Sequence, residues 1–363
     1  MVHVLLLAGC AVVIYLACEW FVNAVEWLGV RLKVGPVAVG TILAAAGTAL
    51  PESVVTLVAV LFGSDEHGAD VGVGAALGGP LVVGTISYGV AGWMLLARRR
   101  RGGAAIAADA PAVGVPDLHV THRPDRGGAG EPAPDADELD GTDTARLARD
   151  QVWFLAIFAV KVALGLVAFA IKPWLGVLFL LAYAAYFRRE VAGGGEHASA
   201  EDLEPLRFQR SRAVPSTAAV VAQTLVTLVV VFFASQLFVQ QLEWAGPALG
   251  LPPVVVALLL SPIATELPET MNAIIWVRQG KAELALANIS GSMMIQATVP
   301  SAIGLFFTPW LFDTPLVLAG VATLAAVAYL LAVLRSGRLT PGRLAAASLF
   351  YVGFAVALVV DLL

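Results

Sequence analysis

Long apolar runs separated by short polar stretches fill most of the chain. A helix needs about 20 residues to cross a hydrocarbon core of ~30 Å, and these runs have or approach that length. They are rich in Leu, Val and Ala, without the alternation at every second position that strands of a membrane β-barrel show. The pattern therefore predicts an all-α membrane protein with ten transmembrane helices. The predicted spans are Val4–Phe21, Val34–Phe62, Val71–Ala97, Val152–Ile171, Trp174–Phe187, Val214–Val239, Pro252–Val277, Leu284–Phe307, Pro315–Leu334 and Leu344–Leu362.

One short polar phrase occurs twice within these apolar runs. It reads Thr48-Ala49-Leu50-Pro51-Glu52 and, 217 residues later, Thr265-Glu266-Leu267-Pro268-Glu269. A carboxylate in the middle of a membrane span is expensive, so an acidic residue there usually marks the path of an ion or substrate. The repetition indicates a duplicated membrane transporter.

The duplication has a geometric consequence for the fold. Each half contains five predicted spans, and an odd number of spans turns the second half upside down relative to the first. We therefore expect two inverted five-helix repeats, an architecture in which broken helices hold the substrate near the midplane. Pro51 and Pro268 would supply the breaks, because proline lacks an N–H donor and frees backbone carbonyls beside Glu52 and Glu269.

The ligands at these breaks would all be oxygen atoms. Carboxylates, freed carbonyls and threonine hydroxyls suit a hard cation such as Ca²⁺, which takes about six to eight oxygen ligands. No thiol or imidazole lies near either motif along the sequence, so softer metals are not favoured. On a regular helix Glu266 and Glu269 share a face, and a metal ion or a proton between them would offset their repulsion.

Composition and charge agree with a membrane protein and suggest its orientation. Hydrophobic residues make up 59% of the chain, charged residues only 13%, and the mean hydropathy is +0.83, values that soluble domains rarely reach. Lys and Arg collect in alternate connections, such as Arg98–Arg101 and Arg207–Arg212, and basic residues are retained in the cytoplasm. We expect a multi-pass protein of the inner (plasma) membrane with both termini outside. Its expected partners are the lipid bilayer and transported cations, with no nucleic acid; the sequence does not indicate any protein partner.

The order of apolar and polar segments predicts five regions. Residues 98–150 are rich in Gly, Ala, Pro and Asp and contain no Phe, Tyr or Trp. This composition predicts a disordered cytoplasmic linker. Residues 1–97 hold the first three helices of repeat one with its motif, and residues 151–190 hold its last two helices. A cytoplasmic loop at 191–212 precedes repeat two, residues 213–363.

The chain lacks the motifs of enzymes and ATP-driven pumps. No Walker motif, Rossmann fingerprint or Ser/His/Asp arrangement occurs in it. Transport would therefore be secondary, and we expect neither catalysis nor a cofactor.

The two motifs resemble the alpha repeats of the calcium/cation antiporter superfamily, most of all its sodium/calcium exchanger branch. Gly47-Thr48-Ala49-Leu50-Pro51-Glu52 and Ala264-Thr265-Glu266-Leu267-Pro268-Glu269 match the family's Gly-Thr-Ser-x-Pro-Glu stretch. The family's second stretch, Gly-Asn-x-x-Gly-Ser-Asn, is similar to Asn288-Ile289-Ser290-Gly291-Ser292-Met293, with Gln296 where a ligand Asn or Asp is usual. Repeat one departs from the pattern, because Gly79 replaces the Ser and Val83 replaces the amide or acid.

The resemblance implies a cation antiporter with a defined ligand set and a moving pair of helices. The implied metal ligands are Glu52, Glu269, Thr48, Thr265, Ser292 and Gln296, and Glu266 is a candidate third carboxylate in place of the family's Ser. The resemblance also implies that the first helix of each half slides between two states that open to opposite faces.

Three functions remain open at this point: exchange of Ca²⁺ for Na⁺ or H⁺, monovalent Na⁺/H⁺ antiport, and cation binding without transport. Lys161, inside the predicted span Val152–Ile171, bears on this choice. Its ammonium either pairs with a site carboxylate or fills a vacated ion position, or else the span is shifted so that the side chain reaches an interface.

Overall fold

The described part of the computed structural model consists of helices and their connections. It covers residues 2–35, 38–49, 53, 66–109, 139, 142–192, 203–248, 259 and 261–362, and no β-strand occurs in these ranges. The elements are α1 (Val2–Leu32), η1 (Val39–Ala44), α4 (Glu66–Val82), η2 (Val83–Ser87), α5 (Tyr88–Asp109), α6 (Thr144–Gly165), η3 (Lys172–Leu175), α7 (Gly176–Ala192), η5 (Arg207–Gln209), α8 (Thr217–Ala248), α10 (Ser261–Thr265), α11 (Leu267–Arg278), α12 (Ala282–Phe307), α13 (Thr314–Arg335), α14 (Pro341–Ala346) and α15 (Ser348–Leu362). The prediction of an all-α protein is confirmed for these residues.

Several helices have the length and composition of membrane spans. Six segments of the described chain qualify: Val2–Leu32, Ala76–Arg100, Thr217–Phe238, Ala282–Phe307, Thr314–Arg335 and Pro341–Asp361. Large apolar side chains such as Val12, Phe233 and Val356 are exposed on their outer faces, as expected where lipid is the solvent.

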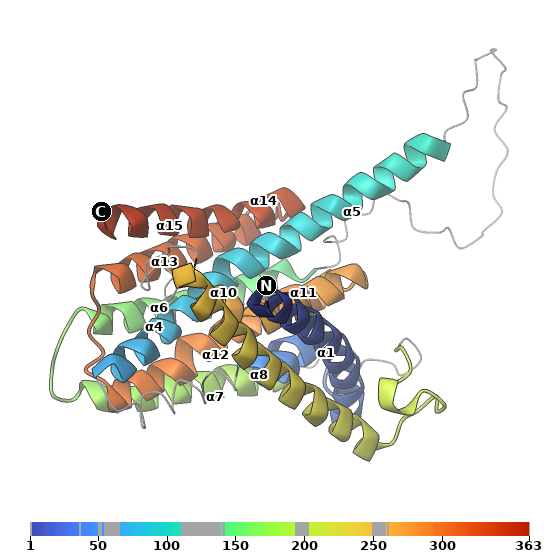
Figure 1. The fold of residues 1–363 in the computed structure, drawn as a ribbon, viewed down its shortest axis with the longest axis horizontal. Helices are drawn as coiled ribbons and strands as arrows, with labels where there is room; N and C mark the ends of the chain where they lie inside the picture. Colours follow the sequence, from blue (N-terminus) through green and yellow to red (C-terminus); the bar gives the residue numbers. More distant parts are fainter. Residues whose placement is uncertain are drawn as a thin grey trace, which may run out of the picture.

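Helix α12 forms the centre of the molecule. It contacts α4, α6, α7, α11 and η1, and 83% of its most apolar 18-residue segment is buried. Helices α4, α6, α7, α12, α13 and α15 run roughly alongside one another, whereas α1 and α8 form a separate pair that crosses them at an angle (Figure 1). Only 28% of the most apolar 18-residue segment of α1, and the same share of that of α8, is buried, so much of the surface of this pair faces outward.

The α1–α8 pair is connected to the rest by polar contacts at one end. Glu26 of α1 accepts hydrogen bonds from Lys281 Nζ at 2.6 and 2.7 Å and from Trp276 Nε1 at 2.9 Å. The ion pair joins α1 to the turn between α11 and α12. The loop that carries η5 is connected to α1 as well, because Trp27 Nε1 donates to the carbonyl of Glu204 at 2.8 Å.

Glycines allow η1 and α12 to cross in close contact. A Cβ atom on Gly291 would overlap backbone atoms of Thr41, and one on Gly40 would lie 2.9 Å from the carbonyl oxygen of Leu284. Small residues let helix backbones approach in this way inside membranes. The segment at the crossing is a π-helical turn, and η2, which follows the glycines of α4, is another; such turns are often found at functional sites.

The helix boundaries differ from the predicted spans and from the predicted linker ends. Helix α5 continues to Asp109 and α6 starts at Thr144, so both ends of the predicted 98–150 linker are helical, and most of its middle lies outside the described residues. Asp143 starts α6 early because its side chain accepts a hydrogen bond from the Arg146 N–H at 2.8 Å. The helix ends at Gly165, whose carbonyl accepts from Phe312 N, and not at Ile171.

The crossing of η1 and α12 can be tested with one methyl group. We expect Gly291→Ala to lower the melting temperature of the detergent-solubilised protein, because overpacking a tight contact costs about 1–3 kcal/mol. The matched control is Gly353→Ala on α15, where nothing lies within 4 Å of the new Cβ and alanine favours the helix by about 1 kcal/mol. Equal melting temperatures for the two variants would contradict the close contact.

Candidate cation site

The second copy of the motif lies at a helix break. Helix α10 ends at Thr265, Glu266 is in a turn, and α11 starts at Leu267 with Pro268 in its first turn. Proline is favoured there because its missing N–H needs no partner in the first turn of a helix. It also leaves the carbonyl of Ala264, four residues earlier, without the usual helical hydrogen bond. The break predicted at Pro268 is confirmed, while Pro51 and Glu52 lie outside the described residues.

The two acidic side chains of this break are buried in the protein. Glu266 is 0% exposed and Glu269 is 1% exposed. Gln296 of α12 donates a hydrogen bond from Nε2 to Oε2 of Glu266, and Asn288 Nδ2 donates to the carbonyl of Glu269 at 3.4 Å. The Glu266 carboxylate and the backbone of Glu269 therefore belong to the contact between the helix break and α12.

A stripe of uncharged polar side chains on α12 faces this break. Asn288, Ser292 and Gln296 follow one another at intervals of four residues, so they lie on one face of the helix, and all three are buried. Within the described residues, Ser292 Oγ and Asn288 Oδ1 have no hydrogen-bond partner. Buried polar atoms without a partner are costly, and a bound cation would satisfy both oxygens.

The glycine that departs from the family pattern makes room for the extra acid. A Cβ on Gly79 of α4 would lie 2.8 Å from Oε1 of Glu266 and 3.2 Å from Nε2 of Gln296. The Glu266 carboxylate thus fills the space beside Gly79 that a serine side chain would need. Gly79 and Glu266 lie far apart in the sequence but are neighbours in the structure, so the two departures from the family pattern compensate each other in volume.

The other departure removes a ligand without replacing it. Val83 is fully buried in η2 and offers no side-chain oxygen. Thr85 and Ser87 lie in the same turn, but Thr85 Oγ1 bonds to the carbonyl of Leu81 and Ser87 Oγ lies 2.8 Å from Thr270 Oγ1. The hydroxyls of η2 are thus already engaged with the protein.

Each of the two motif threonines bonds to a carbonyl of the preceding helical turn, four residues back for Thr48 and three for Thr265. Thr48 Oγ1 donates to the carbonyl of Ala44 at 3.2 Å, and Thr265 Oγ1 donates to the carbonyl of Pro262 at 3.1 Å. Each hydroxyl gives its proton to its own helix, which leaves the oxygen lone pairs for a cation. Thr48 is buried and Thr265 is half-buried.

The structure brings most of the predicted ligands to one place. Thr265, Glu266 and Glu269 lie at the break, and Ser292 and Gln296 lie on the facing stripe of α12. Thr48 is in the helical segment that continues η1, which contacts α12. The described residues contain no group of three or more His, Cys, Asp or Glu that could hold a metal, and Glu52 is outside them.

Two residues near the break were missed by sequence reasoning. Asn272 is fully buried one turn after Glu269, and neither polar atom of its side chain has a hydrogen-bond partner in the described part. An amide in the middle of an apolar span was the available signal. Cys18 of α1 also reaches the motif, because its Sγ donates to the carbonyl of Pro268 at 3.8 Å. The expectation that no thiol lies nearby was therefore wrong in three dimensions.

Lys161 points into the protein. The residue lies one turn before the end of α6, so the predicted span is shifted, yet its side chain is 0% exposed and does not reach an interface. Its Nζ donates to the carbonyls of Ala76 and Gln296, the second at 3.3 Å, and lies 5.0 Å from the ring centre of Phe158.

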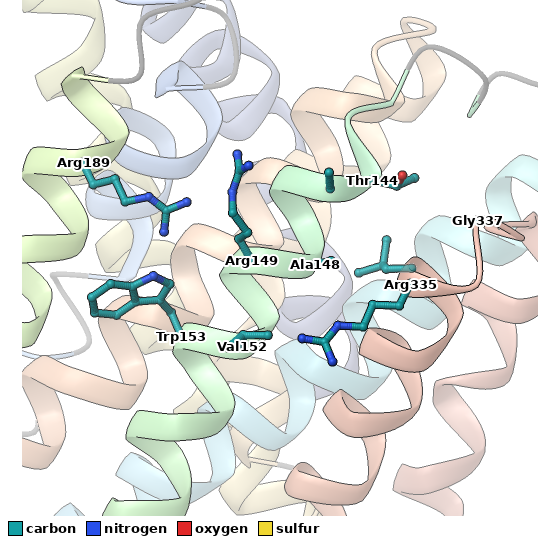
Figure 2. A pocket seen from close by; sticks show the side chains of 10 residues that line it. Thr144, Ala148, Arg149, Val152, Trp153, Arg189, Arg335 and Gly337 are labelled. Carbon is teal, nitrogen blue, oxygen red and sulfur yellow. The ribbon is translucent and has the colours of Figure 1, made fainter.

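A large cavity elsewhere is unsuited to cations. It has a volume of about 580 Å³ and lies between the start of α6, the end of α7 and the end of α13. Three of its lining residues are Arg149, Arg189 and Arg335 (Figure 2). Their positive charges repel cations, so the buried break between α10 and α11 remains the candidate site.

A sequence comparison identifies the family. The sequence profile described as "Sodium/calcium exchanger protein" matches residues 2–114 and 219–360, which is more than half of the chain. The chain belongs to the sodium/calcium exchanger protein family. It is therefore a membrane transporter of cations and not an enzyme, it needs no cofactor, and antiport is favoured over the other two functions. No curated protein matches the chain by sequence.

Solved structures agree with this family at the level of the fold. Structures of the sodium-calcium exchanger NCX_Mj soaked with 2.5 mM Na⁺ and 0.1 mM Sr²⁺, or with 2.5 mM Na⁺ and 0.1 mM Ca²⁺, are each 17% identical with a TM-score of 0.68. In both cases the alignment covers 98% of this chain and 98% of the other. A third, soaked with 100 mM Na⁺ and 10 mM Sr²⁺, is 18% identical with a TM-score of 0.66 and the same coverage.

The pairing of Gly79 with Glu266 can be tested by a double-mutant cycle. We expect Gly79→Ser alone to lower the melting temperature, because the new side chain displaces the Glu266 carboxylate. Adding Glu266→Ser should recover part of the loss, with a coupling energy of about 1–3 kcal/mol. Gly74→Ser, on the same helix with nothing within 4 Å, is the control and should leave the melting temperature nearly unchanged. Additive effects of the two substitutions would contradict the pairing.

Proposed function

We propose that the protein is a secondary active antiporter that exchanges Ca²⁺ for Na⁺ across the plasma (inner) membrane. The observation that carries the proposal is the contact between the α10–α11 break and α12. Glu266 and Glu269 are buried there, and α12 carries the Asn288 and Ser292 oxygen atoms that have no hydrogen-bond partner among the described residues. Acidic side chains at such depth are expensive, and their presence is explained by a cation that binds and leaves.

The ligand chemistry favours a hard divalent cation. The proposed ligands are Glu52, Glu269, Thr48, Thr265, Glu266, Ser292 and Gln296, and Asn272 is a further candidate. All offer carboxylate, hydroxyl or amide oxygens, which suit Ca²⁺ and Na⁺. The Cys18 thiol donates its proton to a backbone carbonyl, so it is no thiolate ligand for a softer metal.

A pair of reciprocal contacts supports the inverted repeat. The segment that leads into the motif of the first half, η1, packs on Gly291 of α12, and α10, which carries the start of the second motif, packs on α4. A Cβ on Gly78 of α4 would lie 2.6 Å from Cγ of Pro262, so a glycine permits the second contact too. In each half, the segment near the first conserved stretch thus packs on the helix of the other half that carries the second stretch. This exchange is expected for two inverted repeats of five helices each.

Alternating access needs a part of the protein that moves against the site. The α1–α8 pair is suited to this role, because it is loosely buried and its main polar attachment is the ion pair of Glu26 with Lys281. In the proposed cycle, the charge of a bound Ca²⁺ or of Na⁺ ions neutralises the carboxylates, and the pair then slides so that the site opens to the other face. Both termini would lie outside, as the distribution of Lys and Arg indicates.

The proposal is tested by ⁴⁵Ca²⁺ uptake into proteoliposomes. We expect Na⁺-loaded vesicles to take up Ca²⁺ when diluted into Na⁺-free buffer. Glu269→Gln and Glu52→Gln should each lower the rate by about tenfold to a hundredfold, since a hydrogen bond or ligand contact to a charged group is worth about 1.5–3 kcal/mol. Glu204→Gln, a mainly exposed carboxylate in the loop before η5, is the matched control and should keep the parent rate.

Each alternative function predicts a different result. A pH gradient that drives uptake in place of the Na⁺ gradient would make H⁺ the driving ion. Uptake of ²²Na⁺ against a pH gradient with no Ca²⁺ uptake would indicate a monovalent antiporter. Ca²⁺ that raises the melting temperature without any flux would indicate binding without transport, and either of the last two results would overturn Ca²⁺ exchange.

A further inference from the structure

Lys161 sits where an ion would be expected. Its Nζ lies between two backbone carbonyls, that of Ala76 on α4 and that of Gln296 on α12. The same Gln296 donates its side-chain amide to Glu266. The ammonium thus contacts α4 and α12, the helices that carry the second conserved stretch of each repeat. One of these contacts is made by Gln296, a residue of the candidate site.

The surroundings of the ammonium are those of a bound cation and not of a surface lysine. The side chain is fully buried, and the rings of Phe158 and Trp310 lie 5.0 and 6.0 Å from Nζ. Carbonyl oxygens and aromatic faces both stabilise a desolvated positive charge. Trp310 is fixed there because its Nε1 donates to the carbonyl of Lys161 at 3.2 Å.

We propose that the Lys161 ammonium is a tethered cation that occupies a monovalent cation position between the carbonyls of Ala76 and Gln296 and replaces one transported Na⁺. The inference rests on the proposed Ca²⁺/Na⁺ exchange and refines it. The loss of an oxygen ligand at Val83 agrees with it, because a protein that carries its own positive charge needs fewer ligands for mobile ions. Without the amine, the two carbonyls become available to Na⁺.

The consequence is a change in stoichiometry that can be measured. Parent protein and Lys161→Met are reconstituted into proteoliposomes, and the membrane potential is set with K⁺ and valinomycin. For fixed Na⁺ and Ca²⁺ gradients, the measurement is the potential at which the net ⁴⁵Ca²⁺ flux is zero. We expect Lys161→Met to move one more Na⁺ per Ca²⁺ and to move one more positive charge in each cycle. Lys161→Arg, which keeps the charge, should retain the parent stoichiometry.

A second buried lysine provides the matched control. Lys172 Nζ donates to the carbonyls of Val167, Pro309 and Trp310 at 2.6, 3.1 and 2.7 Å, but it lies in η3, and none of these carbonyls belongs to α4 or to the helix break. Lys172→Met should leave the stoichiometry unchanged. The same stoichiometry in parent and Lys161→Met would overturn the proposal.

Binding gives a readout that does not need transport. Na⁺ should raise the melting temperature of Lys161→Met more than that of the parent, whereas choline should not. If the parent shows no Ca²⁺ flux, the proposed function fails, while this Na⁺ effect still tests the cation position. If Lys161→Met does not fold, Lys161→Gln replaces it in this test. If neither neutral variant folds in Na⁺ buffer while Lys161→Arg does, Na⁺ cannot take the place of the ammonium, and the proposal is overturned.

The arginine cavity supports a second, independent inference. Arg149 comes from α6, and Arg189 and Arg335 extend toward it from α7 and α13 on opposite sides (Figure 2). No hydrogen bond or ion pair joins any of the three to another residue of the described ranges. Trp153 lines the same cavity, and tryptophan is enriched at the level of lipid headgroups.

We infer that this cavity binds a phosphate group, that of an anionic phospholipid headgroup or free phosphate. Arg is suited to bidentate recognition of phosphate, and three guanidinium groups around about 580 Å³ leave room for one headgroup. The acids nearby do not compete, because Glu190 is bound to Arg146 and Asp150 is buried with Ser290 Oγ at 3.3 Å from its Oδ2.

The test compares lipids and variants in thermal shift and native mass spectrometry. Phosphatidylglycerol should raise the melting temperature of the parent and be retained, and phosphatidylcholine should not. The triple variant Arg149→Gln, Arg189→Gln, Arg335→Gln should bind on the order of a hundredfold more weakly, since each basic residue contributes about fivefold.

One control distinguishes a lipid headgroup from free phosphate, and another distinguishes binding in the cavity from general attraction of anionic lipid to surface arginines. Equal stabilisation by inorganic phosphate would identify free phosphate as the ligand and support the site. The matched variant Arg210→Gln, Arg212→Gln, Arg338→Gln changes three exposed arginines that do not line the cavity and should bind lipid like the parent. An equal loss in both triple variants would overturn a specific site.

Discussion

The burial of carboxylates against α12 is the constraint on which the rest of the architecture depends. A charge taken out of water must be compensated, and the Gln296 amide does part of this by donating a hydrogen bond to the Glu266 carboxylate. The break at Glu266 places the acids at the end of one helix and the start of the next, where Pro268 leaves the carbonyl of Ala264 without its helical partner. The packing of α12 among η1, α4, α6, α7 and α11 then keeps water away from this point. A moving α1–α8 pair at the edge fits the same constraint, because the rigid core need not be rebuilt in each cycle.

The sequence was sufficient for the features that are local. Pro268 predicts a break because a proline acts on its own helix, and the break is where it was expected. The apolar runs predict helices of membrane length, and the repeated acidic phrase locates the buried Glu266 and Glu269. These inferences need only the period of a helix and the cost of charge in lipid.

The sequence was insufficient where residues act across the bundle. The sequence marked Gly79 as a departure from the family pattern and Glu266 as a candidate third carboxylate, but 187 residues separate them and only the fold shows their contact. Asn272 gave a weak signal, and Cys18 gave none. The end of α6 also could not be predicted, since it depends on the contact of Gly165 with Phe312, a residue of another helix connection. Glu52 and Pro51 stay predictions.

The contact between Gly79 and Glu266 has a consequence for the history of the two halves. A duplicated gene starts with two identical copies that can replace each other. Once one copy gives up a side chain and the other enlarges its own to fill the gap, neither half can pair with a duplicate of itself. Two copies of the first half would set Gly79 beside Ala49 and leave a hole, and two copies of the second would set Glu266 against Ser292, where the two side chains would collide. In the proposed inverted repeat, the two halves have thus become complementary, and further drift in one is limited by the shape of the other.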